Sequence, residues 1–268
     1  MTTDASISSL PRDVLDTLAD PEQFIENFLW ITAEADKYGF SDIVPFKLRK
    51  AQRDYVRHRT RRDIILKSRR IGSSSILDAL IYARAAFTSN FSALDVCNDE
   101  GNTIGRRNNY LLFQEKMPPA LRPVLDSDTT KIMSFLNINS RIRLATAGQV
   151  IVGRGDQFHM VRGTEVSRWP KEYIEDNTAG ISEATRYGDL CYESTPAGRS
   201  GFFYEICDEA RRGENEYKLH FYPWWWDERN VLAKGSLLAL EEVRFDFECL
   251  DDEWELMQKH SLTYDQVR

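Results

Sequence analysis

Long hydrophobic runs are missing from this sequence of 268 residues, and so are the features of a secreted protein. No stretch approaches the roughly 18 consecutive apolar residues of a membrane-spanning helix. The first twenty residues lack both the basic start and the apolar core of a signal peptide. We therefore expect a cytoplasmic protein with no membrane partner. An apolar fraction of 42% is still enough for a buried core, in one large domain or two small ones.

Cysteine is scarce as well, and the four that are present are scattered: Cys97, Cys191, Cys207 and Cys249. No two of them lie close together, and no histidine stands at ligand spacing, so a zinc site is not expected. We interpret them as reduced thiols of the core.

A positive net charge is also lacking, because the chain carries −7 at pH 7. This argues against a protein that coats nucleic acid over its whole surface. The basic residues are nevertheless concentrated between positions 47 and 70, where eleven Lys and Arg residues are opposed only by Asp54 and Asp63. This segment either attracts phosphates or forms a solvated helix face that pairs with the acids of residues 241–265, and the sequence leaves both readings open.

Hydrophobic periodicity predicts an alternation of helices and strands. We expect helices to begin at Asp20-Pro21 and to cover residues 47–57, 74–87, 100–116, 202–211, 237–242 and 252–260. We expect strands at 64–66, 92–97, 157–161, 190–192 and 218–222, and a hairpin in 132–144 around Asn139-Ser140. This order favours a mostly parallel sheet with helices on both faces.

The most informative segment is residues 64–75, IILKSRRIGSSS. Three β-favouring residues lead into a turn at Gly72, which would expose backbone N–H groups at a helix N-terminus, where anions bind. The usual phosphate-loop pattern is Gly, four residues, Gly, Lys and Ser or Thr. This chain keeps Gly72 and Ser74 but has Lys67 and Ser73 in place of the first Gly and the Lys. The alternative is an ordinary strand–turn–helix joint.

Two strand ends downstream could supply the chemistry of hydrolysis. One strand leads to Thr164-Glu165, where the carboxylate could orient the attacking water, while Thr164 stands where an Asp normally assists Mg²⁺. Another leads to Ser194-Thr195, whose hydroxyls could bond the γ-phosphate or the water. The plain alternatives are a surface acid and an ordinary Ser/Thr-Pro turn.

A fourth segment lies upstream of the loop, at residues 45–52. The amide of Gln52 could pair with the donor and acceptor edges of adenine, and Phe46 could pack on the face of its ring. The alternative is a surface Gln on an amphipathic helix.

Taken in order, these segments resemble the large subunit of the tailed-bacteriophage terminase. The similarity is carried by residues 20–21, 24–27, 45–52, 67–72, 139–142, 154–155, 163–165, 193–196 and 222–224. No single segment is specific to the family, but the ordered set is.

The resemblance implies an α/β fold: a P-loop NTPase of the additional-strand (ASCE) type, with helices flanking a mostly parallel sheet. It divides the chain into an N-terminal helical segment (1–44), an ATPase core (45–226) and a helical lid or linker (227–268). Several members of the family carry the phosphate-loop lysine early, where Lys67 lies. The implied catalytic residues are Glu165, Lys67, Arg69 and Arg70, with Ser194 and Thr195 for coupling and Ser74 and Thr164 for the metal. The implied nucleotide-binding residues are Phe46, Gln52, Lys67, Ser68, Arg69, Arg70, Ile71, Gly72, Ser73, Ser74 and Ser75.

The implied function is an ATPase motor that uses ATP and Mg²⁺ to move double-stranded DNA into a preformed capsid. Its implied partners are the DNA backbone, the portal protein, the small terminase subunit and copies of itself in a ring, at the procapsid portal in the cytoplasm of an infected bacterium. Arg154 and Arg168 are candidates for an arginine donated between subunits. We find no Asp cluster for the nuclease that usually follows in this family. The alternatives are a helicase-like translocase and a catalytically silent nucleotide-binding assembly module.

Overall fold

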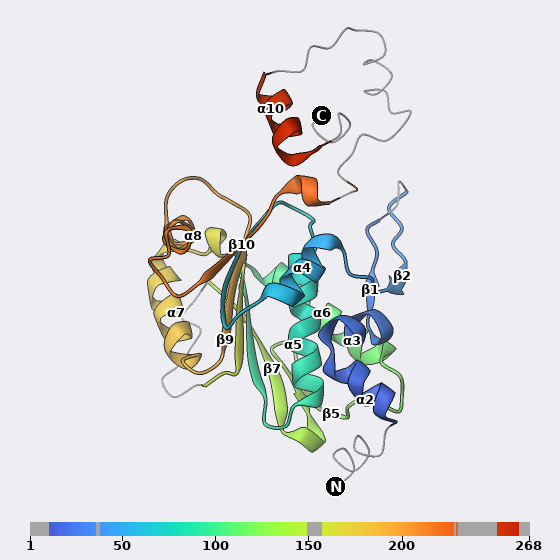
Figure 1. Cartoon of the computed structure of the whole chain (residues 1–268). Helices are drawn as coiled ribbons and strands as arrows, with labels where there is room; N and C mark the ends of the chain where they lie inside the picture. The colour runs from blue at the N-terminus through green and yellow to red at the C-terminus, as the bar shows by residue number, and fades with distance from the viewer. Residues whose placement is uncertain (1–10, 36–37, 149–156, 228, 230–250, 263–268) are drawn as a thin grey trace. The chain divides into compact units, whose positions relative to one another are not determined.

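The computed structural model describes residues 11–35, 38–148, 157–227, 229 and 251–262 (Figure 1). The chain divides into two compact units, Met1–Tyr222 and Pro223–Arg268. The described part of the predicted N-terminal segment, residues 11–44 with their gap, falls inside the first unit. In the second unit the structure describes a short 3₁₀ helix, η3 (Trp224–Trp226), and α10 (Asp251–His260), which matches the helix predicted at 252–260. The helix predicted at 237–242 lies outside the described residues.

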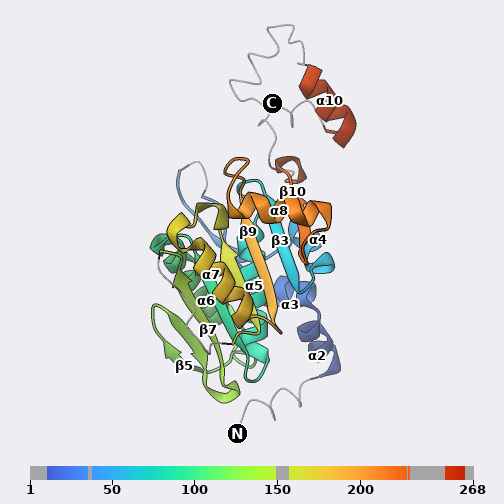
Figure 2. The same ribbon diagram turned by 90° about the vertical axis from the view of Figure 1, so that its left-hand side faces the viewer.

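The first unit is built on an eight-stranded sheet in the order β10-β3-β9-β8-β4-β7-β6-β5 (Figure 2). Neighbouring strands from β10 to β7 run parallel, whereas β6 and β5 are antiparallel additions. The strands are β3 (Arg62–Lys67), β4 (Ser92–Cys97), β5 (Leu125–Asp128), β6 (Ile132–Phe135), β7 (Ser140–Thr146), β8 (Met160–Thr164), β9 (Asp189–Ser194) and β10 (Lys218–Tyr222). Because β9 is inserted between β3 and β8, the sheet has the additional strand that the sequence led us to expect.

Helices cover both faces of this sheet (Figure 1). On one face lie α5 (Ser73–Phe87) and α6 (Glu100–Lys116), joined by α2 (Arg12–Ala19), α3 (Pro21–Phe28) and α4 (Lys50–His58). The other face is covered by α7 (Lys171–Ala184) and α8 (Phe202–Arg212). A separate two-stranded sheet pairs β1 (Trp30–Thr32) with β2 (Ile43–Pro45). None of the described helices is both long and apolar enough to cross a bilayer.

The central strands are buried on both sides because helices cover both faces. Every residue of β4 and of β8 is buried. Beneath α7 and α8 the core includes Ile64, Val161, Tyr192, Ile181 and Phe203. Three of the four cysteines, Cys97, Cys191 and Cys207, are buried and unpaired, as predicted, and Cys249 lies outside the described residues. Burial raises the pKa of the Cys207 thiol to about 12.

Several element boundaries match the sequence prediction and others differ. The strand 92–97, the helix 100–116 and the strand 218–222 are confirmed at both ends. The helix predicted at 47–57 begins at Lys50, where the side chain of Gln52 accepts a hydrogen bond from the backbone N–H of Arg49 at 2.9 Å. The strand predicted at 157–161 is displaced to Met160–Thr164. The hairpin is confirmed, with η1 (Leu136–Ile138) and a left-handed Asn139 (φ 49°) before β7.

Part of the basic segment from 47 to 70 forms ion pairs on a helix face. Arg53 pairs with Glu22 at 2.7 Å and with Glu26 at 2.8 Å, and Arg57 pairs with Glu22. These partners belong to α3, whereas the predicted attraction of phosphates stays a prediction. The basic residues at the end of the segment line a cavity instead.

Candidate functional site

The turn between β3 and α5 requires a glycine at position 72. Gly72 has φ 87°, in the left-handed region that side-chain-bearing residues rarely adopt. A Cβ atom there would lie 2.5 Å from Nε2 of Gln52 and 2.7 Å from a guanidinium nitrogen of Arg49. The same Gln52 nitrogen donates a hydrogen bond to the Gly72 carbonyl at 2.9 Å. The turn is therefore fixed both by its backbone conformation and by a brace from α4.

This turn places the N-terminus of α5 at the carboxyl edge of the sheet, after β3. The first N–H groups of a helix have no partner within it, and they carry the positive end of the helix dipole. In α5 they belong to Ser73, Ser74 and Ser75. A strand, a left-handed glycine and a helix N-terminus in this order form an arrangement at which proteins commonly bind anions.

Lys67 and Glu165 meet beside this loop although they are 98 residues apart in the sequence. Lys67 ends β3, and Glu165 directly follows β8 in a left-handed conformation with φ 50°. Lys67 Nζ lies 3.1 Å from Glu165 Oε1, and the lysine side chain is only 8% exposed. Thr195 Oγ1 donates to Glu165 Oε2 at 3.3 Å, and Arg168 Nε lies 3.6 Å from the same oxygen. The structure thus brings the early lysine and the predicted acid together.

A second carboxylate, Glu193, belongs to the same cluster; it lies in the segment 193–196 that carries the family similarity, but no role was predicted for it. It is fully buried near the end of β9, opposite Thr164 of β8. Thr164 Oγ1 donates to Glu193 Oε1 at 2.8 Å, and Lys67 Nζ lies 3.8 Å from Glu193 Oε2. Burial alone would raise the pKa of Glu193, but the charges of Lys67 and Arg162 and hydrogen bonding to Ser74 and Thr164 lower it overall. Glu193 is therefore a buried carboxylate at neutral pH.

This cluster opens onto a cavity of about 380 Å³. Six of the residues that the sequence singled out line it: Lys67, Arg69, Arg70, Glu165, Arg168 and Thr195. Asn98, Asp99 and Asn102 complete the wall, at the junction of β4 and α6. Asp99 caps α6 by accepting the Asn102 N–H at 2.7 Å, and this backbone hydrogen bond lowers the pKa of Asp99. The sequence signal for these three residues is Asp99, an Asp that can cap a helix, placed two residues after the end of a strand.

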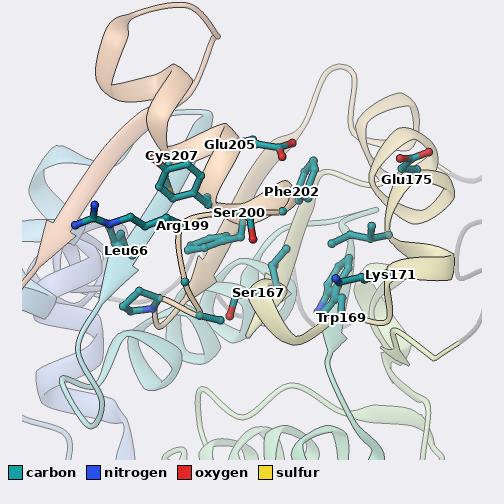
Figure 3. A pocket seen from close by; sticks show the side chains of 18 residues that line it. Leu66, Ser167, Trp169, Lys171, Glu175, Arg199, Ser200, Phe202, Glu205 and Cys207 are labelled. Carbon is teal, nitrogen blue, oxygen red and sulfur yellow. The ribbon is translucent and has the colours of Figure 1, made fainter.

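The two predicted coupling residues are connected to different groups. Thr195 contacts Glu165, as described above, whereas Ser194 Oγ lies 2.7 Å from the hydroxyl of Ser167 in η2 (Val166–Arg168). Ser167 also lines a second cavity of about 590 Å³, on the opposite face of the sheet (Figure 3). That cavity is lined by apolar groups, including Leu66, Trp169 and Phe202, together with the charged residues Lys171, Glu175, Arg199 and Glu205. The segment after β9 borders both cavities, because Thr195 lines the first and residues 196–201 line the second.

The residues predicted to contact adenine are placed differently from the phosphate-binding residues. Phe46 is fully buried, so in this structure its ring face is not presented to a ligand. Gln52 is 2% exposed, and its amide is engaged by Gly72 and by the N–H of Arg49. Their contact with a base stays a prediction, and the structure assigns Gln52 a different role as the brace of the loop.

The site can hold a divalent cation only if a bound ligand supplies some of the coordinating oxygen atoms. Among the described residues no group of three or more His, Cys, Asp or Glu side chains could hold a metal ion. Mg²⁺ is commonly bound through one or two carboxylates together with substrate phosphates. Two carboxylates, Glu165 and Glu193, lie beside Lys67, and the hydroxyl of Thr164 donates to Glu193. Arg154 lies outside the described residues, whereas Arg168 lies at the site itself.

A fully buried arginine, Arg162, anchors the start of α5 beside the site. Arg162 of β8 pairs with Asp78 of α5 at 2.6 Å and with Asp95 of β4. Its guanidinium also donates to the Ser74 carbonyl at 2.9 Å. The start of α5 is therefore anchored to the two strands on which it lies.

Solved structures share this architecture. The HK97 bacteriophage large terminase matches with a TM-score of 0.61 and 14% identity, over 91% of this chain and 52% of that chain. The large terminase ATPase domain of Thermus phage P74-26 matches with a TM-score of 0.53 and 16% identity, over 83% of this chain and 92% of that chain. This chain thus spans about half the length of the HK97 protein. No protein-family model and no curated protein matches the sequence. At these identities the similarity shows the fold, which is that of the large terminase ATPase domain.

Proposed function

We propose that this chain is the ATPase motor domain of a viral terminase large subunit, which hydrolyses ATP with Mg²⁺ to move double-stranded DNA into a preformed capsid. One observation carries the proposal: Lys67 Nζ and Glu165 Oε1 lie 3.1 Å apart beside the N-terminus of α5. An anion loop, a lysine and an acid from a neighbouring strand are the parts that phosphoryl transfer to water requires. The shared fold is consistent with this assignment.

Each side chain then has a defined task. Lys67 exchanges its pairing with Glu165 for the β- and γ-phosphates, which the N–H groups of residues 72–75 also bind. Glu165, released from Lys67, orients the attacking water and accepts its proton. Arg69 and Arg70, which line the cavity, stabilise the γ-phosphate. Ser74 and Thr164 would hold Mg²⁺ together with the phosphates, and the cation would neutralise part of the phosphate charge.

The coupling step is assigned to the segment after β9. Thr195 contacts Glu165, and Ser194 contacts Ser167, so a change at the catalytic acid reaches the turn before α7 through two hydroxyls. We place the motor in a homo-oligomeric ring at the portal of a procapsid, in the cytoplasm of the infected bacterium, with the portal protein and the small subunit as partners. DNA is held through its phosphates without regard to sequence, so binding should weaken steeply with salt.

The test separates binding from hydrolysis. We expect Glu165→Gln to bind a fluorescent ATP analogue as wild type does and to lose about 10²–10⁴-fold in ATP turnover, because the general base is missing. Lys67→Met should instead lose nucleotide affinity, since its charge-assisted bonds to phosphate contribute about 1.5–3 kcal/mol. Glu183→Gln, an exposed change on α7, is the control and should match wild type in both assays.

Two results would contradict the proposal in different ways. A wild-type chain that binds the analogue but shows no turnover with portal and DNA present, and no change in Glu165→Gln, is a silent nucleotide-binding module. A chain that hydrolyses ATP on single-stranded nucleic acid but not with portal and double-stranded DNA is a helicase-like translocase.

A further inference from the structure

The end of β9 carries a carboxylate at the position directly across from Thr164. In the register of the two parallel strands Thr164 pairs with Glu193, so both side chains lie on the sheet face that α5 covers. Glu193 is 0% exposed, and Thr164 is 3% exposed. A buried acid therefore stands one strand away from the position where the sequence led us to expect a metal-assisting Asp.

One oxygen of this acid is unsatisfied. Glu193 Oε1 accepts the hydroxyl of Thr164, but Oε2 is buried and has no hydrogen-bond partner among the described residues. Lys67 Nζ, at 3.8 Å, is too distant for a hydrogen bond and is closer to Glu165. A buried carboxylate oxygen without a partner is costly, by about 1–3 kcal/mol or more. A fold retains such a group most readily where a ligand completes its bonding.

The surrounding hydroxyl groups indicate which ligand that is. Ser74 stands where phosphate loops carry the hydroxyl that binds Mg²⁺, and its side chain contributes to lowering the pKa of Glu193. The backbone carbonyl of Ser74 accepts a hydrogen bond from Arg162 at 2.9 Å. Ser74 is thus held through its backbone by one buried charge, and its side chain lies close to another.

Resting on the ATPase function proposed above, we propose that Glu193 is the metal-positioning carboxylate of this site, moved from β8 to β9. It holds the hydroxyls of Ser74 and Thr164 in place for the divalent cation that accompanies the nucleotide. An Asp at position 164 of β8 is then not required, because Glu193, paired with Thr164 on the neighbouring strand β9, supplies the negative charge. The sequence could not reveal this, since Glu193 and Thr164 meet only through the pairing of the two strands.

A purely structural role as the counter-ion of Lys67 makes a different prediction. Glu165 already lies closer to Lys67, at 3.1 Å. If Glu193 served only to balance that lysine, its neutralisation would change the affinity for metal-free nucleotide and leave the affinity for the metal unchanged. The metal affinity of the nucleotide complex therefore discriminates the two roles.

The experiment titrates Mn²⁺, followed by its EPR signal, into the full chain saturated with a non-hydrolysable ATP analogue. The dissociation constant of the analogue in EDTA is measured in parallel. Removal of an outer-shell carboxylate typically costs about 10–100-fold in metal affinity, so Glu193→Gln should weaken Mn²⁺ binding by that factor without weakening metal-free binding. The double variant Thr164→Asp/Glu193→Gln, which returns the charge to β8, should recover most of the loss. Glu183→Gln is the matched control and should bind Mn²⁺ as wild type does.

The outcomes distinguish this inference from the function on which it rests. Equal Mn²⁺ affinity in wild type and Glu193→Gln, or no recovery in the double variant, overturns the inference and leaves the ATPase proposal intact. A wild-type chain that binds no analogue with or without metal overturns the ATPase proposal itself. Should Glu193→Gln fail to fold, Glu193→Asp keeps the charge and withdraws it by one methylene. An intermediate loss of Mn²⁺ affinity there supports the role, and an unchanged affinity overturns it.

Discussion

Two clusters of buried charge lie on the same face of the sheet, two residues apart along β8, and they differ in how closely their opposite charges approach and in whether they border a cavity. The first is centred on Arg162, which is 0% exposed and bonded to Asp78, Asp95 and the Ser74 carbonyl. Asp78 also pairs with Arg106 at 2.9 Å, and Asp95 accepts the hydroxyl of Tyr110 at 2.8 Å. Two cations and two anions balance each other away from solvent.

The second cluster is centred on Lys67 and is open. Its carboxylates are Glu165 and Glu193, Glu193 Oε2 lies 3.8 Å from Lys67 Nζ, and the cluster borders a cavity. Arg168, the other cation here, has a side chain that is 51% exposed. A closed cluster fixes the position of strands and helix, whereas an open cluster reserves bonding capacity for a ligand.

The difference also explains why the two clusters are neighbours. Arg162 donates a hydrogen bond to the backbone carbonyl of Ser74, and the side chain of Ser74 helps to lower the pKa of Glu193. The closed cluster therefore acts as the support that keeps the loop in place while the open cluster changes partners. Groups that exchange partners during function need such rigid support around them.

Removing Arg162, the central cation of the closed cluster, should have the largest effect on stability. Arg162→Met leaves Asp78 and Asp95 buried without their main partner, and deleting one member of a buried ion pair costs about 3–5 kcal/mol. Urea denaturation followed by tryptophan fluorescence measures this loss. Arg168→Met removes an exposed pairing and should cost at most about 1 kcal/mol. A loss below about 1 kcal/mol for Arg162→Met would show that the cluster does not support the fold.

Two smaller changes, Asp95→Asn and Glu193→Gln, test one carboxylate of each cluster. Asp95→Asn weakens a satisfied set of charge-assisted bonds and should cost about 1.5–3 kcal/mol of stability. Glu193→Gln, equally buried, should cost less than about 1.5 kcal/mol, because the open cluster gains little from a carboxylate that is only partly bonded. Denaturation midpoints of the two variants in the absence of nucleotide provide the measurement. Equal losses would mean that both clusters are structural.

The elements with local signals could be predicted from the sequence. β4, α6 and β10 are confirmed at both ends because their hydrophobic pattern and caps are contained within each segment. In contrast, α7 was missed because it contains Asn177, Thr178 and Gly180, which are weak helix formers. Tertiary packing overrides that weakness, since Asn177, Thr178 and Ile181 are buried against the core.

The candidate site was predictable where a motif or a family resemblance pointed to a residue. Lys67, Gly72 and Glu165 came from the loop pattern, the strand end and the resemblance, and the structure brings Lys67 and Glu165 together. Glu193 could not be found in this way, because its partner Thr164 is 29 residues away and meets it only through strand pairing. Strand order is set by crossovers between distant segments, and no local pattern encodes it.

A third cluster of buried polar groups lies around Asp63, at the opposite end of β3 from Lys67, and its removal should change stability least. Asp63 accepts hydrogen bonds from Thr60, from the Tyr55 hydroxyl at 3.3 Å and from His220, whose Nε2 lies 3.0 Å away. Burial raises the pKa of Asp63, but the bonds from His220 and Thr60 and the charge of His220 lower it overall. Cys191 on β9 and Tyr55 on α4 are the other titratable groups that face it.

Because the folded pKa of Asp63 is lowered, its carboxylate contributes stability that is complete above the unfolded value near pH 4 and is lost as the pH falls through the folded value. Wild type should therefore lose more stability than Asp63→Asn between pH 5 and pH 3, by about 1 kcal/mol, as expected for a few partly offsetting hydrogen bonds. Urea denaturation across this pH range measures the difference, and Asp176→Asn on the exposed side of α7 is the control. Parallel profiles for wild type and Asp63→Asn would mean that Asp63 contributes no pH-dependent stability, and that a closed set of hydrogen bonds around a carboxylate does not by itself identify a stabilising cluster in this fold.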